Sequence, residues 1–187
     1  MSVAVLEPPE PFLDLDVVKT HLRVEGSGED ALIEAYIAAV CAHLDGVDGW
    51  LGRAIGDQLL ELRLAGFCAA EIPLPFRPVQ EVAAIDYTDA DGAEQTVALD
   101  GYWLDGHVVR LASGKSWPST GSEANPVRLQ YRAGYVETPK AIVVAGLMLV
   151  GDLYTNRETA TASGGAMALN MGASAEMLLS PFRVWDQ

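Results

Sequence analysis

Histidine and cysteine are the side chains in this sequence best suited to metal or nucleophilic chemistry, and they are few. His21, His43 and His107 fall in three separate predicted elements, and none belongs to an HExxH motif or a comparable spacing. Cys41 and His43 are two positions apart on a predicted helix, so their side chains point to roughly opposite sides and cannot easily share a metal. We therefore expect no metal site and no cofactor.

The densest group of carboxylates lies in DYTDAD at residues 86–91. The group suggests calcium ligands, but it lacks the DxDxDG order and the terminal glutamate of an EF-hand loop. A solvated hairpin turn explains it more simply. Gly164 and Gly165 have no strand before them and no lysine after them, and the sequence contains no GxSxG motif. We therefore expect a protein that is not an enzyme.

Length and cysteine content set the broad class. The chain has 187 residues, which suits one domain or one domain with an appendage. Its two cysteines, Cys41 and Cys68, form no CxxC motif, so a reduced intracellular setting fits better than a disulfide framework. The first twelve residues lack the basic and long apolar regions of a secretory signal.

Charge is the strongest signal in the composition. The chain carries 12 basic and 26 acidic residues, a net charge of −14. Residues 1–60 hold 11 acidic and 3 basic residues, a net charge of −8. Because sequence-independent binding to phosphates requires positive charge, we do not expect the chain to grip DNA. An acidic wall past which DNA slides is one explanation of the acidity, and solubility is the other.

Two predicted helices come before the predicted strands. Asp14 is placed to cap a short helix, and Ser27 with Asp30 has capping-box spacing at the start of a longer one. Gly52 is expected to end this longer helix. The apolar residues of the longer helix step by three and four along one face. They are Ile33, Tyr36, Ile37, Val40, Leu44, Val47 and Leu51.

A period of two follows, which is typical of strands. Residues 59–64 and 127–131 alternate between apolar and polar side chains. Hairpins are expected to turn at Asp91-Gly92 and at Asp105-Gly106. Residues 72–78 contain too many prolines for a central strand, so we expect an edge strand or a linker there.

The main predicted helix begins after Pro139. Its charge-free run, residues 141–151, is 11 residues long, whereas a membrane span needs about 20. Asp152 closes the run, and a helix that is apolar nearly all round is expected to be buried in a core.

These elements predict an α+β fold: a helical-bundle core with an inserted small antiparallel β region and a flexible C-terminal tail. The expected divisions are N-terminal core helices over 1–58, the β region over 59–135, the main core helix over 136–158, and a flexible tether with a docking tail over 159–187.

Two segments are candidates for protein contact. The polar group Tyr154, Asn156, Arg157 and Glu158 ends the main helix, as a subunit contact or as a solvated helix end. The apolar residues after Ser174 would contribute about 1.5–3 kcal/mol each if buried, whereas ordering the backbone costs roughly 1–2 kcal/mol per residue. Since the two sums are comparable, we expect the tail to dock on a partner instead of its own subunit.

Several stretches together resemble the head–tail connector (adaptor) proteins of long-tailed bacteriophages and of phage-derived gene transfer agents. They are DLDVVKTHLRVEGSGEDALIEAYIAAV, IPLPFRPVQEVAAIDYTDADG, LQYRAGY, PKAIVVAGLMLVGDLYTNRE and LLSPFR. The resemblance spans almost the whole chain, and the order and spacing of the motifs carry it.

The resemblance implies a structural virion protein without catalytic residues, located in the neck between capsid and tail and assembled in the host cytoplasm. Its expected partners are further copies in a ring, a dodecamer, together with the portal protein and a tail-side stopper or tail terminator. DNA would pass through the ring without specific binding, and no membrane is involved. The expected portal-docking residues are Met177, Leu178, Leu179, Phe182, Arg183 and Trp185.

A binding module is the alternative function. In that case the β region would bind a small ligand or carbohydrate, with helical flanks, and Tyr102, Trp103 and Trp117 would form a stacking patch.

Overall fold

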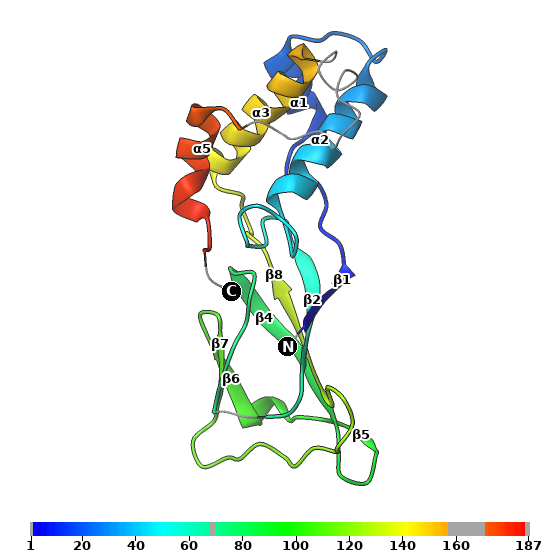
Figure 1. The fold of residues 1–187 in the computed structure, drawn as a ribbon, viewed down its shortest axis with the longest axis vertical. Coiled ribbons are helices and arrows are strands. Elements are labelled where there is room, and N and C mark those ends of the chain that lie inside the picture. The colour runs from blue at the N-terminus through cyan, green and yellow to red at the C-terminus, as the bar shows by residue number, and fades with distance from the viewer. Residues whose placement is uncertain (1, 68–69, 157–170, 186–187) are drawn as a thin grey trace. The chain divides into compact units, whose positions relative to one another are not determined.

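The structure is a computed structural model that describes residues 2–67, 70–156 and 171–185. The chain divides into two compact units. The sheet unit comprises residues 1–9 and 53–136, and the helical unit comprises residues 10–52 and 137–187. Figure 1 shows the elements of both units.

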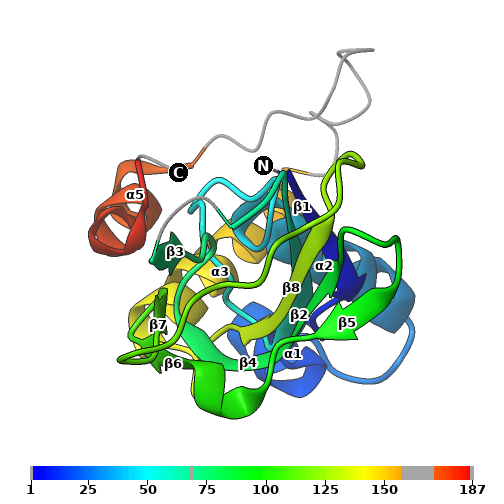
Figure 2. The same cartoon turned by 90° about the horizontal axis from the view of Figure 1, so that it is seen from below.

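The larger sheet of the sheet unit has five antiparallel strands in the order β1-β2-β8-β4-β5. Strand β2 therefore lies between β1 and β8, the strands from the beginning and the end of the unit's sequence (Figures 1 and 2). The strands are β1 (Ser2–Glu7), β2 (Gln58–Leu64), β8 (Val127–Ala133), β4 (Val79–Thr88) and β5 (Glu94–Thr96).

The smaller sheet has three antiparallel strands, β3 (Glu71–Pro73), β7 (Val108–Leu111) and β6 (Tyr102–Asp105), in that order, and a 3-10 turn, η1 (Leu99–Gly101), precedes β6. Both predicted hairpins are confirmed: β4 pairs with β5 and β6 with β7. Gly92 and Gly106 have φ angles of +83° and +61°, which the turns require. Proline-rich β3 lies at an edge, as predicted.

Alternation along β2 and β8 builds the core of the sheet unit. In the register, Leu60 lies opposite Tyr131 and Leu62 opposite Leu129, and on the other side of β8 Leu129 faces Ile85 of β4. All five side chains are fully buried. Because side chains in a strand alternate between faces, the residues between these five form a polar face on the other side of the sheet.

The helical unit contains α1 (Leu15–Leu22), α2 (Asp30–Leu44), α3 (Lys140–Thr155), α5 (Ala173–Leu179) and the 3-10 turn η2 (Ser180–Phe182). Helix α3 contacts α1, α2 and α5. It buries Ile142, Ala145 and Leu149 completely, so the prediction of a core helix is confirmed. Among the described residues, no helix is long and apolar enough to cross a membrane.

The ends of the first two helices only partly match the predictions. Asp14 does cap α1, since its Oδ1 accepts hydrogen bonds from the amides of Asp16 and Val17. The predicted capping box of α2 is absent: Glu29 is the N-cap residue and makes no side-chain cap bond. The Asp30 carboxylate instead accepts a hydrogen bond from the Lys19 ammonium at 2.5 Å.

The predicted helical-bundle core with a small β insertion is wrong. The fold is β-rich, with two antiparallel sheets that form a unit with its own buried core. One reason is β1, which the sequence analysis did not predict: residues 2–7 add an edge strand to β2. The predicted flexible tail is also wrong for residues 171–185, because they form α5 and η2 and pack on their own unit.

Candidate docking surface on the C-terminal segment

The C-terminal segment, residues 171–185, runs from α5 through η2 into extended backbone at Arg183. The hydroxyl of Ser180 donates to the carbonyl of Met177 at 3.2 Å, and Pro181 lies in the first turn of η2. Both features end α5 and redirect the chain, because proline cannot continue a helix.

One side of the C-terminal segment anchors it to the helical unit. Ala175 and Leu179 are buried, and the helix that carries them contacts α3. The amide of Val184 donates to the carbonyl of Leu51 at 2.9 Å. Leu179, which we predicted to dock on a partner, is therefore fully covered by its own unit in this structure.

The other side of the segment is open. Met177 is 70% exposed and Trp185 is 73% exposed, although both are large apolar side chains. Leu178, Phe182 and Arg183 are half-buried between the two sides. Of the predicted docking residues, Leu179 thus holds the segment to its own unit, and the other five are exposed or half-buried.

Trp50 is a member of this surface that the sequence analysis missed. The Arg183 guanidinium lies 4.1 Å from the centre of the Trp50 ring and 4.0 Å from the centre of the Trp185 ring. These three side chains form the Trp50–Arg183–Trp185 stack. No local pattern in the sequence points to it, because the residues come from two distant segments.

The turn after α2 holds Trp50 in place. Helix α2 ends at Leu44 instead of continuing to Leu51, and Gly46 has a φ of +81°. The amide of Trp50 donates to the carbonyl of His43 at 2.8 Å. A Cβ atom at Gly49 would lie 2.4 Å from the carbonyl oxygen of Asp45, so the turn requires glycine there.

The polar group at the end of α3 makes contacts inside the helical unit. The Tyr154 hydroxyl donates to the Glu29 carboxylate, and the Asn156 side chain donates to the carbonyl of Asp152 at 3.1 Å. Arg157 and Glu158 lie outside the described residues. Asn156 is exposed, so it remains accessible to a neighbouring subunit.

A second candidate surface is the polar face of the five-stranded sheet. Glu61 lies opposite Gln130, Arg63 opposite Arg128, and Arg128 opposite Asp86. Glu61 is only 5% exposed and is paired with Arg63, which limits the cost of burying its charge.

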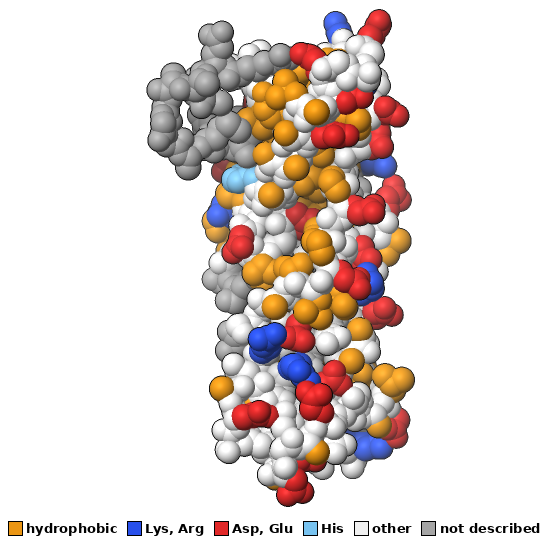
Figure 3. Space-filling model, turned by 90° about the vertical axis from the view of Figure 1, so that its right-hand side faces the viewer, with side chains coloured by type: hydrophobic (Ala, Val, Ile, Leu, Met, Phe, Trp, Pro, Cys, Tyr) orange, Lys and Arg blue, Asp and Glu red, His pale blue; other side chains and the backbone are white. Residues whose placement is uncertain are grey.

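Carboxylates already occupy the three arginines of this polar face. The pairs are Arg63–Glu61 at 2.7 Å, Arg128–Glu94 at 2.6 Å, Arg132–Asp57 at 2.7 Å and Arg132–Glu7 at 2.7 Å. Glu81 and Asp86 add further carboxylates opposite Arg132 and Arg128. The positive charge of the arginines is therefore offset by carboxylates, and the surface in Figure 3 shows carboxylates spread over the side of the chain that it displays.

The aromatic residues of the alternative function do not form one patch. Tyr102 and Trp103 are neighbours on β6, so their side chains point to opposite faces of the smaller sheet. Trp117 stacks on Phe67, with ring centres 4.7 Å apart. Trp103 is half exposed and lies beside the Arg110 guanidinium.

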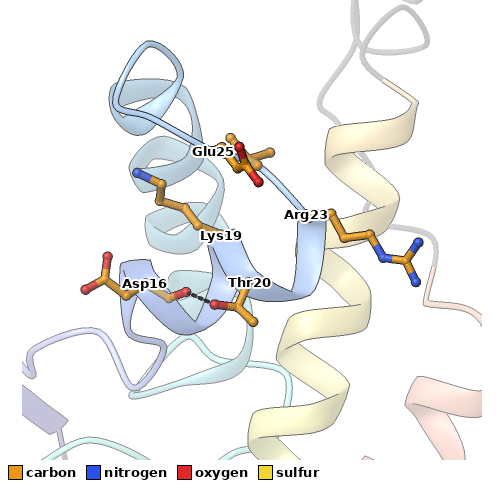
Figure 4. Close-up of a pocket in the computed structure, with 6 residues that line it drawn as sticks. Asp16, Lys19, Thr20, Arg23 and Glu25 are labelled. Carbon is orange, nitrogen blue, oxygen red and sulfur yellow. Dashed lines mark hydrogen bonds between the residues drawn. The ribbon is translucent and has the colours of Figure 1, made fainter.

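A hollow beside α1 does not have the features of a ligand site. Figure 4 shows Asp16, Lys19, Thr20, Arg23 and Glu25 around an open depression. Lys19 is paired with Asp30, and the Thr20 hydroxyl donates to the carbonyl of Asp16. Within the described ranges, no group of three or more His, Cys, Asp or Glu side chains is placed to hold a metal ion.

Comparison with solved structures identifies the fold. No protein-family model and no curated protein match the sequence. The chain is similar over its full length to a chain in the neck of an empty gene transfer agent (GTA) particle computed with C6 symmetry, covering 97% of that chain at 23% identity and a TM-score of 0.76. Comparable matches are to the virion of a native GTA particle, at 23% identity and a TM-score of 0.74, and to the neck of a native GTA particle computed with C12 symmetry, at 21% identity and 0.68. Each covers all of this chain and 97% of the other, so the whole fold is shared with these particle proteins.

Proposed function

We propose that the chain is a structural, non-enzymatic virion protein that forms the ring-shaped head–tail connector (adaptor) between the portal and the tail of a phage or GTA particle. The observation that carries this proposal is the full-length likeness to GTA neck and virion chains, at TM-scores up to 0.76. The chain would reside in the neck and assemble in the host cytoplasm.

The proposed partners are other copies of the chain, the portal protein, and a tail-side stopper or tail terminator. The similar neck assemblies have C6 and C12 symmetry, and a ring of twelve copies is compatible with both. In such a ring many weak contacts act together, so each can be small. The polar group Tyr154, Asn156, Arg157 and Glu158, of which the first two lie at the end of α3, is a proposed subunit contact.

The proposed portal contact is the open side of the C-terminal segment. Met177 and Trp185 are the most exposed of its members, and Leu178, Phe182 and Arg183 border them. Exposed aromatic and methionine side chains are enriched at protein interfaces. Leu179 holds the segment to α3 in this arrangement.

The proposed conduit carries DNA without binding it. A subunit with a net charge of −14, repeated around a duplex, repels phosphate. The paired arginines of the polar sheet face support this proposal, since neighbouring carboxylates offset their positive charge.

Co-assembly with the portal protein tests the proposal. We expect electron micrographs of the purified chain mixed with the portal protein of its own particle to show an added ring of density on the portal. The chain without portal is the control, because ring formation can require the portal. A mixture in which the portal remains bare, even with a large excess of the chain, would count against the connector role.

No specific observation favours the ligand-binding alternative. Tyr102 and Trp103 face opposite ways, and one face of the Trp117 ring is occupied by Phe67. A carbohydrate-stacking patch built from all three side chains does not fit this geometry.

A further inference from the structure

The Trp50–Arg183–Trp185 stack joins the turn after α2 to the end of the C-terminal segment. We propose that Trp50 and Arg183 are positioning residues that hold the Trp185 indole outward as a preformed anchor for an apolar, acid-rimmed pocket on a partner protein. This inference rests on the proposed function and identifies how its docking surface is built.

The stack has the geometry of two cation–π contacts that share one cation. The guanidinium lies 4.1 Å from one ring centre and 4.0 Å from the other, well inside the 6 Å range of such contacts. A planar guanidinium can stack on both its faces, which a lysine ammonium cannot do. Because Arg183 contacts both rings, the place of Trp50 restricts where the Trp185 ring can lie.

The base of the stack is rigid because backbone hydrogen bonds hold both of its sides. The amide of Trp50 is bound to His43, and the amide of Val184, between Arg183 and Trp185, is bound to Leu51. Trp185 is nevertheless 73% exposed, so the stack supports one side of the indole and leaves the rest free. A side chain held in its bound conformation before binding loses less entropy when it binds.

The chemistry of the surface indicates the kind of partner. Trp185 and Met177 offer large apolar area, and tryptophan is among the residues that most often dominate binding energy. Arg183 adds a positive charge at the border of this apolar area, and no carboxylate within residues 2–67, 70–156 and 171–185 forms an ion pair with it. An indole-sized apolar pocket with carboxylates at its rim complements both features.

A second copy of this chain fits the surface less well. Two exposed apolar side chains fall far short of the roughly 800 Å² per partner that a stable dimer buries. The hollow beside α1 is lined mainly by polar side chains, and the hollow at the end of β8 is lined by Gln80, Glu81 and Tyr135 as well as apolar residues. Neither of these two hollows is an apolar pocket for an indole. We therefore assign the anchor to a different protein, the portal under the proposed function, and leave a second copy as an outcome of the test below.

Fluorine NMR of the full chain labelled with 5-fluorotryptophan tests the positioning role directly. The chain has four tryptophans, and single Trp→Phe variants assign their four resonances. We expect Arg183→Met to shift the resonances of Trp50 and Trp185 while those of Trp103 and Trp117 stay in place. Unshifted Trp50 and Trp185 resonances would show that the stack does not exist in solution and would overturn the inference.

Affinity for the portal protein of the same particle tests the consequence. We expect Trp185→Ala to weaken binding about 30-fold or more, as for a hot-spot residue. Trp50→Leu and Arg183→Met should each weaken it roughly 5-fold, the value of one exposed cation–π contact, and Trp50→Phe should stay within about 2-fold of the wild type because it keeps an aromatic ring. Trp103→Leu, which removes an exposed tryptophan of the sheet unit, is the matched control and should leave affinity unchanged.

The outcomes separate this inference from the proposed function. If Trp185→Ala weakens portal binding but Trp50→Leu and Arg183→Met do not, the chain docks as proposed and the positioning role is wrong. Tighter binding by Trp50→Leu would also overturn it, since the stack would then hold the segment back from the partner. If the wild-type chain does not bind portal while its fluorine spectrum shows the intact stack, the connector proposal fails instead. Self-association that Trp185→Ala abolishes would assign the anchor to a second copy and contradict the choice of partner.

Discussion

The main-chain amide of Val184 donates a 2.9 Å hydrogen bond to the carbonyl of Leu51. The bond ties the C-terminal segment to the turn after α2, in the same unit that buries Leu179 and Ala175. The expectation that this tail would not order on its own subunit weighed only apolar burial against backbone entropy, and it left out hydrogen bonds. In the structure the internal hydrogen bonds of α5 and the bond from Val184 add to the burial of Ala175 and Leu179, while Met177 and Trp185 stay exposed.

Replacing Leu179 should therefore destabilise the fold, not only the assembly. We expect Leu179→Ala to lower the free energy of unfolding by about 2–5 kcal/mol, because it removes a fully buried side chain and leaves a cavity. Urea unfolding followed by circular dichroism measures the change. Met177→Ala, two positions earlier and 70% exposed, is the control and should change it by no more than about 0.5 kcal/mol. Equal, small effects of both changes would mean that the C-terminal segment does not pack on α3 in solution.

His43 should make the helical unit sensitive to mild acid. Burial lowers the pKa of His43 below its ordinary value of 6.5, and its Nε2 has no hydrogen-bond partner among the described residues. The unfolded chain therefore takes up this proton more readily than the folded chain, so stability is full above about pH 6.5 and is lost as the pH falls through the folded pKa.

Comparison of the wild type with His43→Gln isolates this contribution. We expect the urea midpoint of the wild type to fall more between pH 7.5 and pH 5.5 than that of the variant, because the glutamine has no proton to gain. The carboxylates titrate in both proteins and largely cancel in the difference. Parallel loss of stability in the two proteins would show that His43 is freely protonated in the folded state.

Cys41 should be inert until the helical unit opens. It is a buried free cysteine, and desolvation raises the pKa of its thiol to about 11. The thiolate is the reactive form, so at pH 8 only about one molecule in a thousand would be reactive even with access to the reagent. In a Cys68→Ser variant, which leaves Cys41 as the single thiol, we expect labelling by a disulfide reagent to be slow in buffer and complete in denaturing urea. Rapid labelling in buffer would contradict the burial of this side chain.

Charge reversal should reveal an acidic conduit if the N-terminal acids line it. Glu25, Glu34 and Asp48 are exposed acids within residues 25–60. We expect particles that carry Glu25→Lys, Glu34→Lys and Asp48→Lys together to eject DNA more slowly, because the new cations attract phosphate. The change should shrink as salt is raised, and the matching Gln, Gln and Asn variant should lie between the two. Assembled particles whose ejection rate is unaffected would place these acids away from the DNA.

Local patterns in the sequence were sufficient to predict many individual elements. The alternation in 59–64 and 127–131, the turns at Gly92 and Gly106, the cap at Asp14 and the buried main helix all match the structure. Each depends on residues within a few positions of one another, so period, capping and turn chemistry are enough to reveal it.

Local patterns could not predict that the strands form a unit with its own buried core. Whether strands form a small insertion or a unit with its own core depends on their partners, and β1 pairs with β2 across more than 50 residues of sequence. Arg132 and Glu7 form an ion pair across 125 positions. No local period encodes such pairings. The helical periodicity is the stronger local pattern, so the sequence analysis predicts a helical core.

The candidate site shows the same division. The sequence alone was sufficient to find the candidate residues at the C-terminal end, the acidic character of the chain and the absence of a recognisable catalytic motif. Residue type and charge are properties of the sequence itself. Tertiary structure decided that Leu179 points inward, that Met177 and Trp185 remain open, and that Trp50 meets Arg183 from more than 130 residues away. Side-chain direction and long-range contact arise only when the segments pack together, since packing selects which face of each element loses its water.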